Sequence, residues 1–140
     1  MTSGLDTAGR FPAVTASFSS ADRRYEPLEE ILVRYTVELP PTAVVRSVER
    51  SILWYTEGKG EEDIGVHFFE RITERAAVTE ATAGSSFGAR LPSSPLSYEG
   101  VIVKIRWCAR VRLFFEEGRD FVSEHVFEVG HVPVATIVPS

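Results

Sequence analysis

The chain has 140 residues, 44% of them apolar and 25% charged, which predicts a single folded domain with a hydrophobic core and excludes a disordered chain. Its net charge of −5 and its pI near 5.2 disfavour nucleic acid as a ligand, because a protein that neutralises phosphates needs an excess of cations. The sequence contains no run of 18 consecutive apolar residues, so we expect no transmembrane helix.

The first twelve residues are polar, contain glycine and lack a periodic pattern, which predicts a flexible N-terminus (1–12) ahead of one domain (13–140). Within that domain, alternating apolar and polar residues, β-branched and aromatic residues, and Gly or Pro between the runs predict strands. The predicted strands, in chain order, are Ala13–Phe18, Glu30–Glu38, Val44–Thr56, Ile64–Thr73, Gly84–Ala89, Val101–Phe115, Phe121–Val129 and Val132–Val138.

Two segments allow a second interpretation. Val44–Thr56 also has apolar residues at approximately helical spacing, but its valines and the flanking Pro-Pro and Gly-Lys-Gly favour a strand. Glu74–Thr82 has some helical propensity, and we interpret it as weakly extended, continuing the strand before it. In that preceding strand, simple alternation predicts Val66 and Phe68 on one face and Phe69 on the other.

The clearest pattern lies in VIVKIRWCARVRLFF, residues 101–115. Every odd position from Val101 to Phe115 is apolar, whereas four of the even positions are cations. A period of two is typical of a strand with one buried and one exposed face, so Ile105 and Trp107 are expected to point inward. With seven to nine strands and almost no helix, the sequence predicts an all-β fold, an antiparallel immunoglobulin-like β-sandwich.

The segment FFEEGRDF, residues 114–121, predicts a β-hairpin between two strong strands. In the register we prefer, Gly118 supplies the left-handed residue of a type I turn with a G1 bulge, and Phe115 lies opposite Arg119. A two-residue Glu117-Gly118 turn would shift the register by one and set Arg110 against His125. The first register is preferred because it pairs more opposite charges.

The exposed face of this strand carries a stripe of cations, here called the cationic stripe: Lys104, Arg106, Arg110 and Arg112. One interpretation is a contact site for a partner or an anion, such as an acidic lipid headgroup or a phosphorylated peptide. The interpretation we favour is a solvated face neutralised by the hairpin partner, with Arg110 facing Glu124 and Arg106 facing Glu128. On that interpretation Lys104 and Arg112 stay unpaired.

No catalytic, cofactor-binding or metal-binding signature stands out, and we expect a protein that is not an enzyme. The three histidines, His67, His125 and His131, do not have metal-ligand spacing, and the acidic loop Glu57–Asp63 lacks the order of a calcium loop. Neighbouring arginines would lower the pKa of the Cys108 thiol, but no general base accompanies it.

Cys108 is also the single cysteine, so no internal disulfide can form, and a reducing compartment is the simplest interpretation. The start of the chain, MTSGLDTAGRF, lacks the basic and apolar regions of a signal peptide. We therefore expect a cytoplasmic location.

A Leu-Pro pair, then a Pro-Leu-Ser-Tyr-Glu-Gly turn, lead into the long strand with its Ile-x-Trp-x-Ala-x-Val pattern. The residues concerned are Leu91, Pro92, Pro95, Leu96, Ser97, Tyr98, Glu99, Gly100, Ile105, Trp107, Ala109 and Val111. This arrangement resembles the arrestin fold family, and the likeness extends weakly over Ala13–Val138. The resemblance implies a sandwich of the arrestin-lobe type. The chain has room for one such lobe, as in small stand-alone bacterial arrestin-like proteins.

The resemblance implies that the protein acts as an adaptor or scaffold and binds other proteins at loops or open sheet edges. Pro40-Pro41 is not followed by the residues of a PPxY motif, and we find no counterpart of the buried charged core that senses receptor phosphates. Receptor regulation is therefore not carried over. We expect protein partners, with a second copy of the chain as one of them. The alternative is a module that binds a ligand or carbohydrate through Trp54 or the Glu57–Asp63 loop.

Overall fold

The computed structural model describes residues 11–130, which form nine strands and one short helix. Seven of the eight predicted strands lie within these residues and are present, two with the predicted ends and five with ends that differ by one or two residues. The elements in chain order are β1 (Ala13–Phe18), β2 (Arg24–Tyr25), β3 (Glu30–Glu38), β4 (Val45–Gly58), β5 (Ile64–Ile72), α2 (Arg75–Ala83), β6 (Ser85–Arg90), β7 (Tyr98–Glu99), β8 (Val103–Phe115) and β9 (Asp120–Val129).

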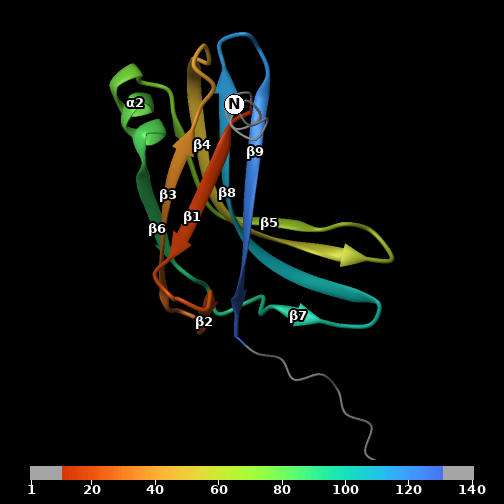
Figure 1. Cartoon of the computed structure of the whole chain (residues 1–140). Helices are drawn as coiled ribbons and strands as arrows, with labels where there is room; N and C mark the ends of the chain where they lie inside the picture. The colour runs from red at the N-terminus through yellow and green to blue at the C-terminus, as the bar shows by residue number, and fades with distance from the viewer. Residues whose placement is uncertain (1–10, 131–140) are drawn as a thin grey trace, which may run out of the picture.

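The strands form two sheets that pack face to face (Figure 1). The smaller sheet has the order β1-β3-β6, and the larger one has the order β2-β9-β8-β4-β5, with β7 added alongside β8. Every pairing is antiparallel except that of the two-residue β2 with β9. This arrangement confirms the predicted antiparallel β-sandwich. In Figure 1 the part of the larger sheet that carries β5 and β7 extends past the smaller sheet.

The core lies between the sheets, and the inward-facing residues of β8 form part of it together with residues of β3, β4, β6, β9 and α2. Trp107, Ala109, Val111 and Leu113 are completely buried, as the period of two predicts. The rings of Trp107 and Phe127 of β9 pack with their centroids 6.0 Å apart. The indole N–H of Trp107 donates to a backbone carbonyl. β4 is also a strand, so the helical alternative for that segment is wrong.

The start of the long strand differs from the prediction. Val101 and Ile102 are exposed, and β8 begins at Val103. The backbone N–H of Gly100 donates to the carbonyl of Val103 at 3.1 Å, which closes a turn over the two exposed residues. Alternation in the sequence therefore continues two residues beyond the strand, because a turn can carry apolar residues without burying them.

The β8–β9 hairpin has the predicted turn. Gly118 has φ of +99°, and its N–H donates to the carbonyl of Phe115 at 3.0 Å. The N–H of Phe115 in turn donates to the carbonyl of Arg119 at 2.9 Å, and Arg110 faces Glu124. The preferred register is therefore confirmed.

The segment predicted as weakly extended, Glu74–Thr82, instead forms helix α2. The carboxylate of Glu74 caps it by accepting hydrogen bonds from the backbone N–H groups of Ala76 and Ala77, at 3.1 and 3.0 Å. Val78 and Ala81 are buried against the core. The segment forms a helix instead of continuing the strand for two local reasons. The cap satisfies backbone N–H groups at the start of the helix, and alanine has a high helix propensity.

A β-bulge in β5 overturns the predicted faces of that strand. Ile52 of β4 pairs with Phe68 and the next residue, Leu53, pairs with Val66, so His67 is the extra residue. Phe68 stays on the core side, whereas Val66 moves to the outer side with Phe69. Bulges are set by packing against the neighbouring strand, and simple alternation cannot locate them.

Two predictions fall largely outside the described residues. The predicted flexible N-terminus, residues 1–12, overlaps the structure only at Phe11 and Pro12. The predicted last strand, Val132–Val138, lies outside it, as does His131. Within residues 11–130, α2 is not long or apolar enough to span a membrane.

Candidate interaction surfaces

The cationic stripe lies on the side of the larger sheet that faces away from the smaller sheet, here called the outer face. Each of its four cations has a carboxylate within ion-pair distance. The pairs are Lys104 with Glu99 at 3.1 Å, Arg106 with Glu57 at 2.5 Å, Arg110 with Glu124 at 2.5 Å and Arg112 with Asp120 at 2.6 Å.

The prediction that Lys104 and Arg112 stay unpaired is therefore wrong. The predicted charge pair between Arg106 and Glu128 does not form either, because Arg106 pairs with Glu57 and Glu128 pairs with Arg24 at 3.3 Å. These predictions considered only the residues directly opposite on β9. Asp120, the partner of Arg112, is on β9 but two residues from the position opposite Arg112. The carboxylates that pair with Lys104 and Arg106 come from β7 and β4, which also flank β8. The stripe is neutral as a set, and its contact with a partner or anion stays a prediction.

An apolar strip runs along the free side of the outer face, on β5. Ile64, Val66 and Phe69 are 57%, 57% and 54% exposed. Beside them on β4 lies Leu53, which is buried although it is on the outer face. We call Ile64, Val66 and Phe69 the β5 strip, and it occupies the strand that Figure 1 shows at the free side of the larger sheet.

β5 is an edge strand, since no other strand of the described part of the chain pairs with its free side. An edge presents unpaired backbone N–H and C=O groups to solvent. The bulge at His67 interrupts this edge, and the His67 ring donates through Nε2 to the carbonyl of Arg90 in β6 at 2.6 Å. The uninterrupted part of the edge is Phe68–Ile72.

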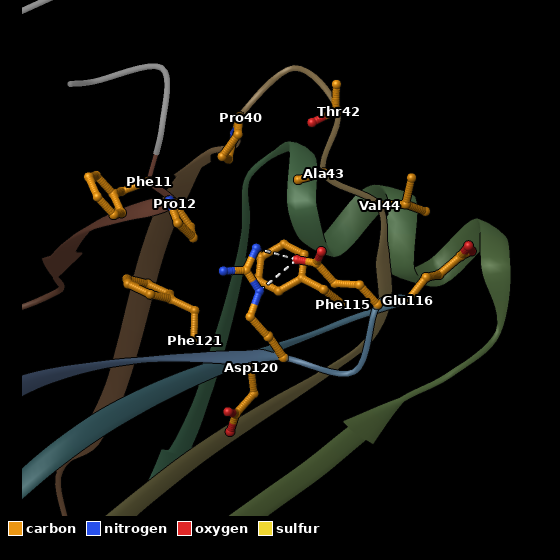
Figure 2. Close-up of a pocket in the computed structure, with 12 residues that line it drawn as sticks. Phe11, Pro12, Pro40, Thr42, Ala43, Val44, Phe115, Glu116, Asp120 and Phe121 are labelled. Atoms are coloured by element: carbon orange, nitrogen blue, oxygen red, sulfur yellow. Dashed lines mark hydrogen bonds and ion pairs between the residues drawn. The ribbon is translucent and has the colours of Figure 1, made fainter. Parts of the chain in front are cut away.

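A recess of about 490 Å³ lies at the end of the sandwich where the β8–β9 turn is (Figure 2). Three segments that are far apart in the sequence form it: the entry to β1, the β3–β4 loop and the β8–β9 hairpin. Its lining residues are Phe11, Pro12, Pro40, Thr42, Ala43, Val44, Phe115, Glu116, Glu117, Arg119, Asp120 and Phe121. In Figure 2, Phe11, Pro12 and Pro40 lie on one side and Ala43 and Val44 on the other.

A charged cluster lies between the two sheets and was missed by the sequence analysis. Arg50 is only 8% exposed, and its guanidinium donates to Glu70 of β5, to Ser85 Oγ at 3.1 Å and to the Ser86 carbonyl at 3.2 Å. It also lies over the ring of Phe87, 5.4 Å from the centroid. A signal was present, because Arg50 is two residues from Val48 and from Ile52 and so shares their inward face.

Trp54 and the Glu57–Asp63 loop are the alternative sites that the sequence predicts for a ligand or carbohydrate. Trp54 is partly buried, and a side chain at Gly65 would meet its indole ring at 2.2 Å. The Glu57–Asp63 loop borders a shallow hollow with Tyr55 and Arg110 on the outer face. Among residues 11–130, no group of three or more His, Cys, Asp or Glu side chains is arranged to hold a metal ion.

Cys108 differs from the expectation of a lowered pKa. It is completely buried, and this burial raises the pKa of its thiol to about 12, with the Glu124 carboxylate adding to the effect. Arg110, whose charge is paired with Glu124, lowers that pKa, but burial outweighs its effect. A protonated thiol in the interior of a sheet is not a nucleophile.

The described residues form an all-β antiparallel sandwich of the arrestin-lobe type. One solved structure that supports this fold is Spo0M, a sporulation control protein from Bacillus subtilis, with a TM-score of 0.59 and 14% identity. The match covers 86% of this chain and 50% of Spo0M, so the chain spans half the length of that protein. At this identity the likeness shows the fold alone.

A second solved structure, a superoxide reductase (neelaredoxin) from Ignicoccus hospitalis, has a TM-score of 0.47 and 11% identity over 92% of this chain and 87% of the other. A likeness at that level carries no argument about fold or activity. No protein-family model matches the sequence, and no curated protein matches it.

Proposed function

We propose that this protein is a non-enzymatic, arrestin-like adaptor module that binds another protein at the β5 edge. The observation that carries the proposal is the position of the β5 strip. Three large apolar side chains, each more than half exposed, lie on an edge strand whose backbone is unpaired on its free side. Neighbouring apolar residues at an open edge are characteristic of strand addition by a partner.

Strand addition would use both the unpaired backbone and the exposed apolar side chains of this edge. Backbone hydrogen bonds from Phe68–Ile72 would provide affinity, while Phe69 would contact alternate side chains of the incoming strand on the outer face. The bulge at His67 limits the length of the added strand, because the backbone direction changes there. A short partner segment fits such an edge better than a long one.

The paired charges on the outer face favour recognition by direct contact over long-range electrostatic attraction of a partner. The four cations of the stripe are each paired, so the face next to β5 has no large field of one sign. Contact with the apolar side chains, rather than electrostatic steering, is then the main source of affinity. The cationic stripe would then lie at the rim of this interface.

The absence of catalysis and a reducing, cytoplasmic location form part of the same proposal. A buried thiol with a raised pKa supports it, since Cys108 is neither a nucleophile nor accessible to a second thiol. The alternative of carbohydrate binding through Trp54 is less well supported, because that ring is partly buried and packs over Gly65.

Site-specific photocrosslinking tests the proposal in cells. The variant Phe69→p-benzoylphenylalanine places the crosslinker in the β5 strip, and Thr79→p-benzoylphenylalanine places it on the exposed side of α2 as the control. We expect protein adducts from position 69 that disappear when Val66→Glu is added. The same adducts from both positions, or none from position 69, would rule out β5 as the binding edge.

The same design distinguishes a second copy of the chain from another protein. An adduct of twice the mass of the chain identifies the partner as a second copy. In that case light scattering should show a dimer that Phe69→Glu converts to a monomer.

A further inference from the structure

The recess at the loop end of the sandwich is a second, separate surface, and its walls are held in place by backbone hydrogen bonds. The N–H of Glu116 donates to the carbonyl of Val44 at 3.0 Å, which ties the β8–β9 hairpin to the β3–β4 loop. The N–H of Ala43 donates to the carbonyl of Pro40 at 3.0 Å and closes the turn in that loop. A pre-formed recess loses little conformational entropy when it is filled.

The inner surface of the recess is apolar. Phe115 is buried and Phe121 partly buried, and they form its deep side within the hairpin. Phe11 and Val44, at 62% and 54% exposed, stand at the opening. Aromatic and aliphatic side chains that remain exposed around a concavity are typical of a site that takes up an apolar group.

The charges around the opening are unequal. Arg119 is paired with Glu117 at 2.6 Å. Asp120 is paired with Arg112 outside the recess. Glu116 forms no ion pair within residues 11–130, so one carboxylate is in excess at the opening. Such a site favours a cationic group over an anionic one.

The geometry points to a binding site for a peptide segment in which an apolar side chain is followed or preceded by Lys or Arg. The apolar side chain enters the recess between Val44 and Phe121, and the cation pairs with the carboxylate of Glu116. This site is independent of the β5 edge, since the two surfaces share no residue. It gives an adaptor a second contact, through which two segments of one partner, or two partners, could be held at once.

The test uses two tetrapeptides, each acetylated and amidated: Arg-Leu-Phe-Arg and Glu-Leu-Phe-Glu. Binding to the full chain is followed by two-dimensional NMR of backbone amides. We expect Arg-Leu-Phe-Arg to shift the amides of Val44, Glu116 and Phe121, with at least fivefold tighter binding than the acidic peptide. No shift at those amides, or equal binding of both peptides, would overturn the proposal.

Variants make the assignment specific. Val44→Arg places a long side chain across the opening and should abolish binding, whereas Glu116→Gln should weaken it about three- to tenfold. Glu116→Arg should reverse the preference toward the acidic peptide. Glu80→Gln, the same change at an exposed position on α2, is the matched control and should bind as the wild type does.

A folding check and a site check accompany these variants. Thermal unfolding of each variant tests whether a loss of binding is caused by a loss of folded structure. If Phe69→Glu abolishes peptide binding and Val44→Arg does not, the peptide binds at the β5 edge and the recess is not the site. Failure of the recess variants leaves the photocrosslinking result at position 69 unaffected, so the two proposals fail separately.

Discussion

Arg50 and Glu70 form an ion pair on the core side of the larger sheet, with Arg50 Nε donating to the Glu70 carboxylate at 2.8 Å. The same guanidinium reaches Ser85 and the carbonyl of Ser86 in the smaller sheet. One buried side chain thus connects β4, β5 and β6. Since no buried polar side-chain atom among the described residues lacks a partner, the cluster is fully satisfied.

The first prediction concerns this pair. Glu70→Ala leaves a mostly buried guanidinium without its carboxylate, and we expect a loss of about 1–2 kcal/mol in the free energy of unfolding. That loss is smaller than the roughly 3–5 kcal/mol of a fully buried pair, because Glu70 is partly exposed and water screens it. Urea unfolding gives the value. Glu128→Ala, in the exposed pair with Arg24, is the control and should cost less than about 1 kcal/mol. Equal losses in both variants would contradict the prediction.

The second prediction concerns Cys108 at alkaline pH. Burial raises the pKa of this thiol to about 12, whereas a thiol in the unfolded chain titrates near its ordinary value of about 8.5. Between these values the unfolded state has lost the proton that the folded state keeps. Stability should therefore be fully present below about pH 8.5 and fall by up to about 1.4 kcal/mol per pH unit above it.

Urea unfolding between pH 8 and 10.5, compared for the wild type and Cys108→Ala, measures this effect. The comparison is needed because burial also raises the pKa of Tyr35 and of Tyr55. The wild type should lose more stability than the variant over this range. Parallel curves for the two proteins would mean that the thiol does not titrate differently in the folded state.

The third prediction concerns His125 at mildly acidic pH. Burial lowers the pKa of this imidazole, and the nearby Arg23 charge lowers it further. A histidine whose folded pKa is lowered stabilises the protein above the ordinary pKa of about 6.5, and the contribution is lost as the pH falls below it. We expect His125→Gln to reduce the loss of stability between pH 7.5 and pH 5.5, measured by urea unfolding.

The wild type is the reference at every pH in this experiment. An equal fall in stability for His125→Gln and the wild type between pH 7.5 and pH 5.5 would contradict the prediction.

The fourth prediction concerns the hairpin turn. Gly118 has φ of +99°, and no heavy atom lies within 4 Å of the position that a β-carbon would take. Gly118→Ala therefore meets no steric clash and loses stability only through backbone strain, by about 1 kcal/mol. Gly118→Asn should lose less, because asparagine tolerates positive φ better. Thermal unfolding compares the three proteins, and a gain in stability for Gly118→Ala would exclude the left-handed conformation.

Much of this fold follows from local pattern. The period of two in residues 103–115 is enough to place Trp107 and Leu113 in the core, because side chains of a strand alternate between its faces whatever the partner. The turn at Gly118 is likewise local, since it depends on the φ preference of one residue. Helix α2 was missed although its signal, the cap at Glu74, is also local.

Contacts between distant segments could not be predicted in the same way. The carboxylates that pair with Lys104 and Arg106 come from β7 and β4, so their identity depends on the register of three strands. The bulge at His67, which brings Val66 to the outer face, depends on packing against β4. The recess needs the β1 entry, the β3–β4 loop and the hairpin to meet at one end.

By itself, the sequence determined that this protein is an antiparallel β-sandwich with a long central strand and a glycine hairpin. Those features depend on alternation and turn chemistry within a few residues. Only the tertiary structure decided which charges are neutralised, which edge is open, and which partners the buried Arg50 has. Each of these depends on residues far apart in the chain, and burial and pairing exist only after the sheets have packed.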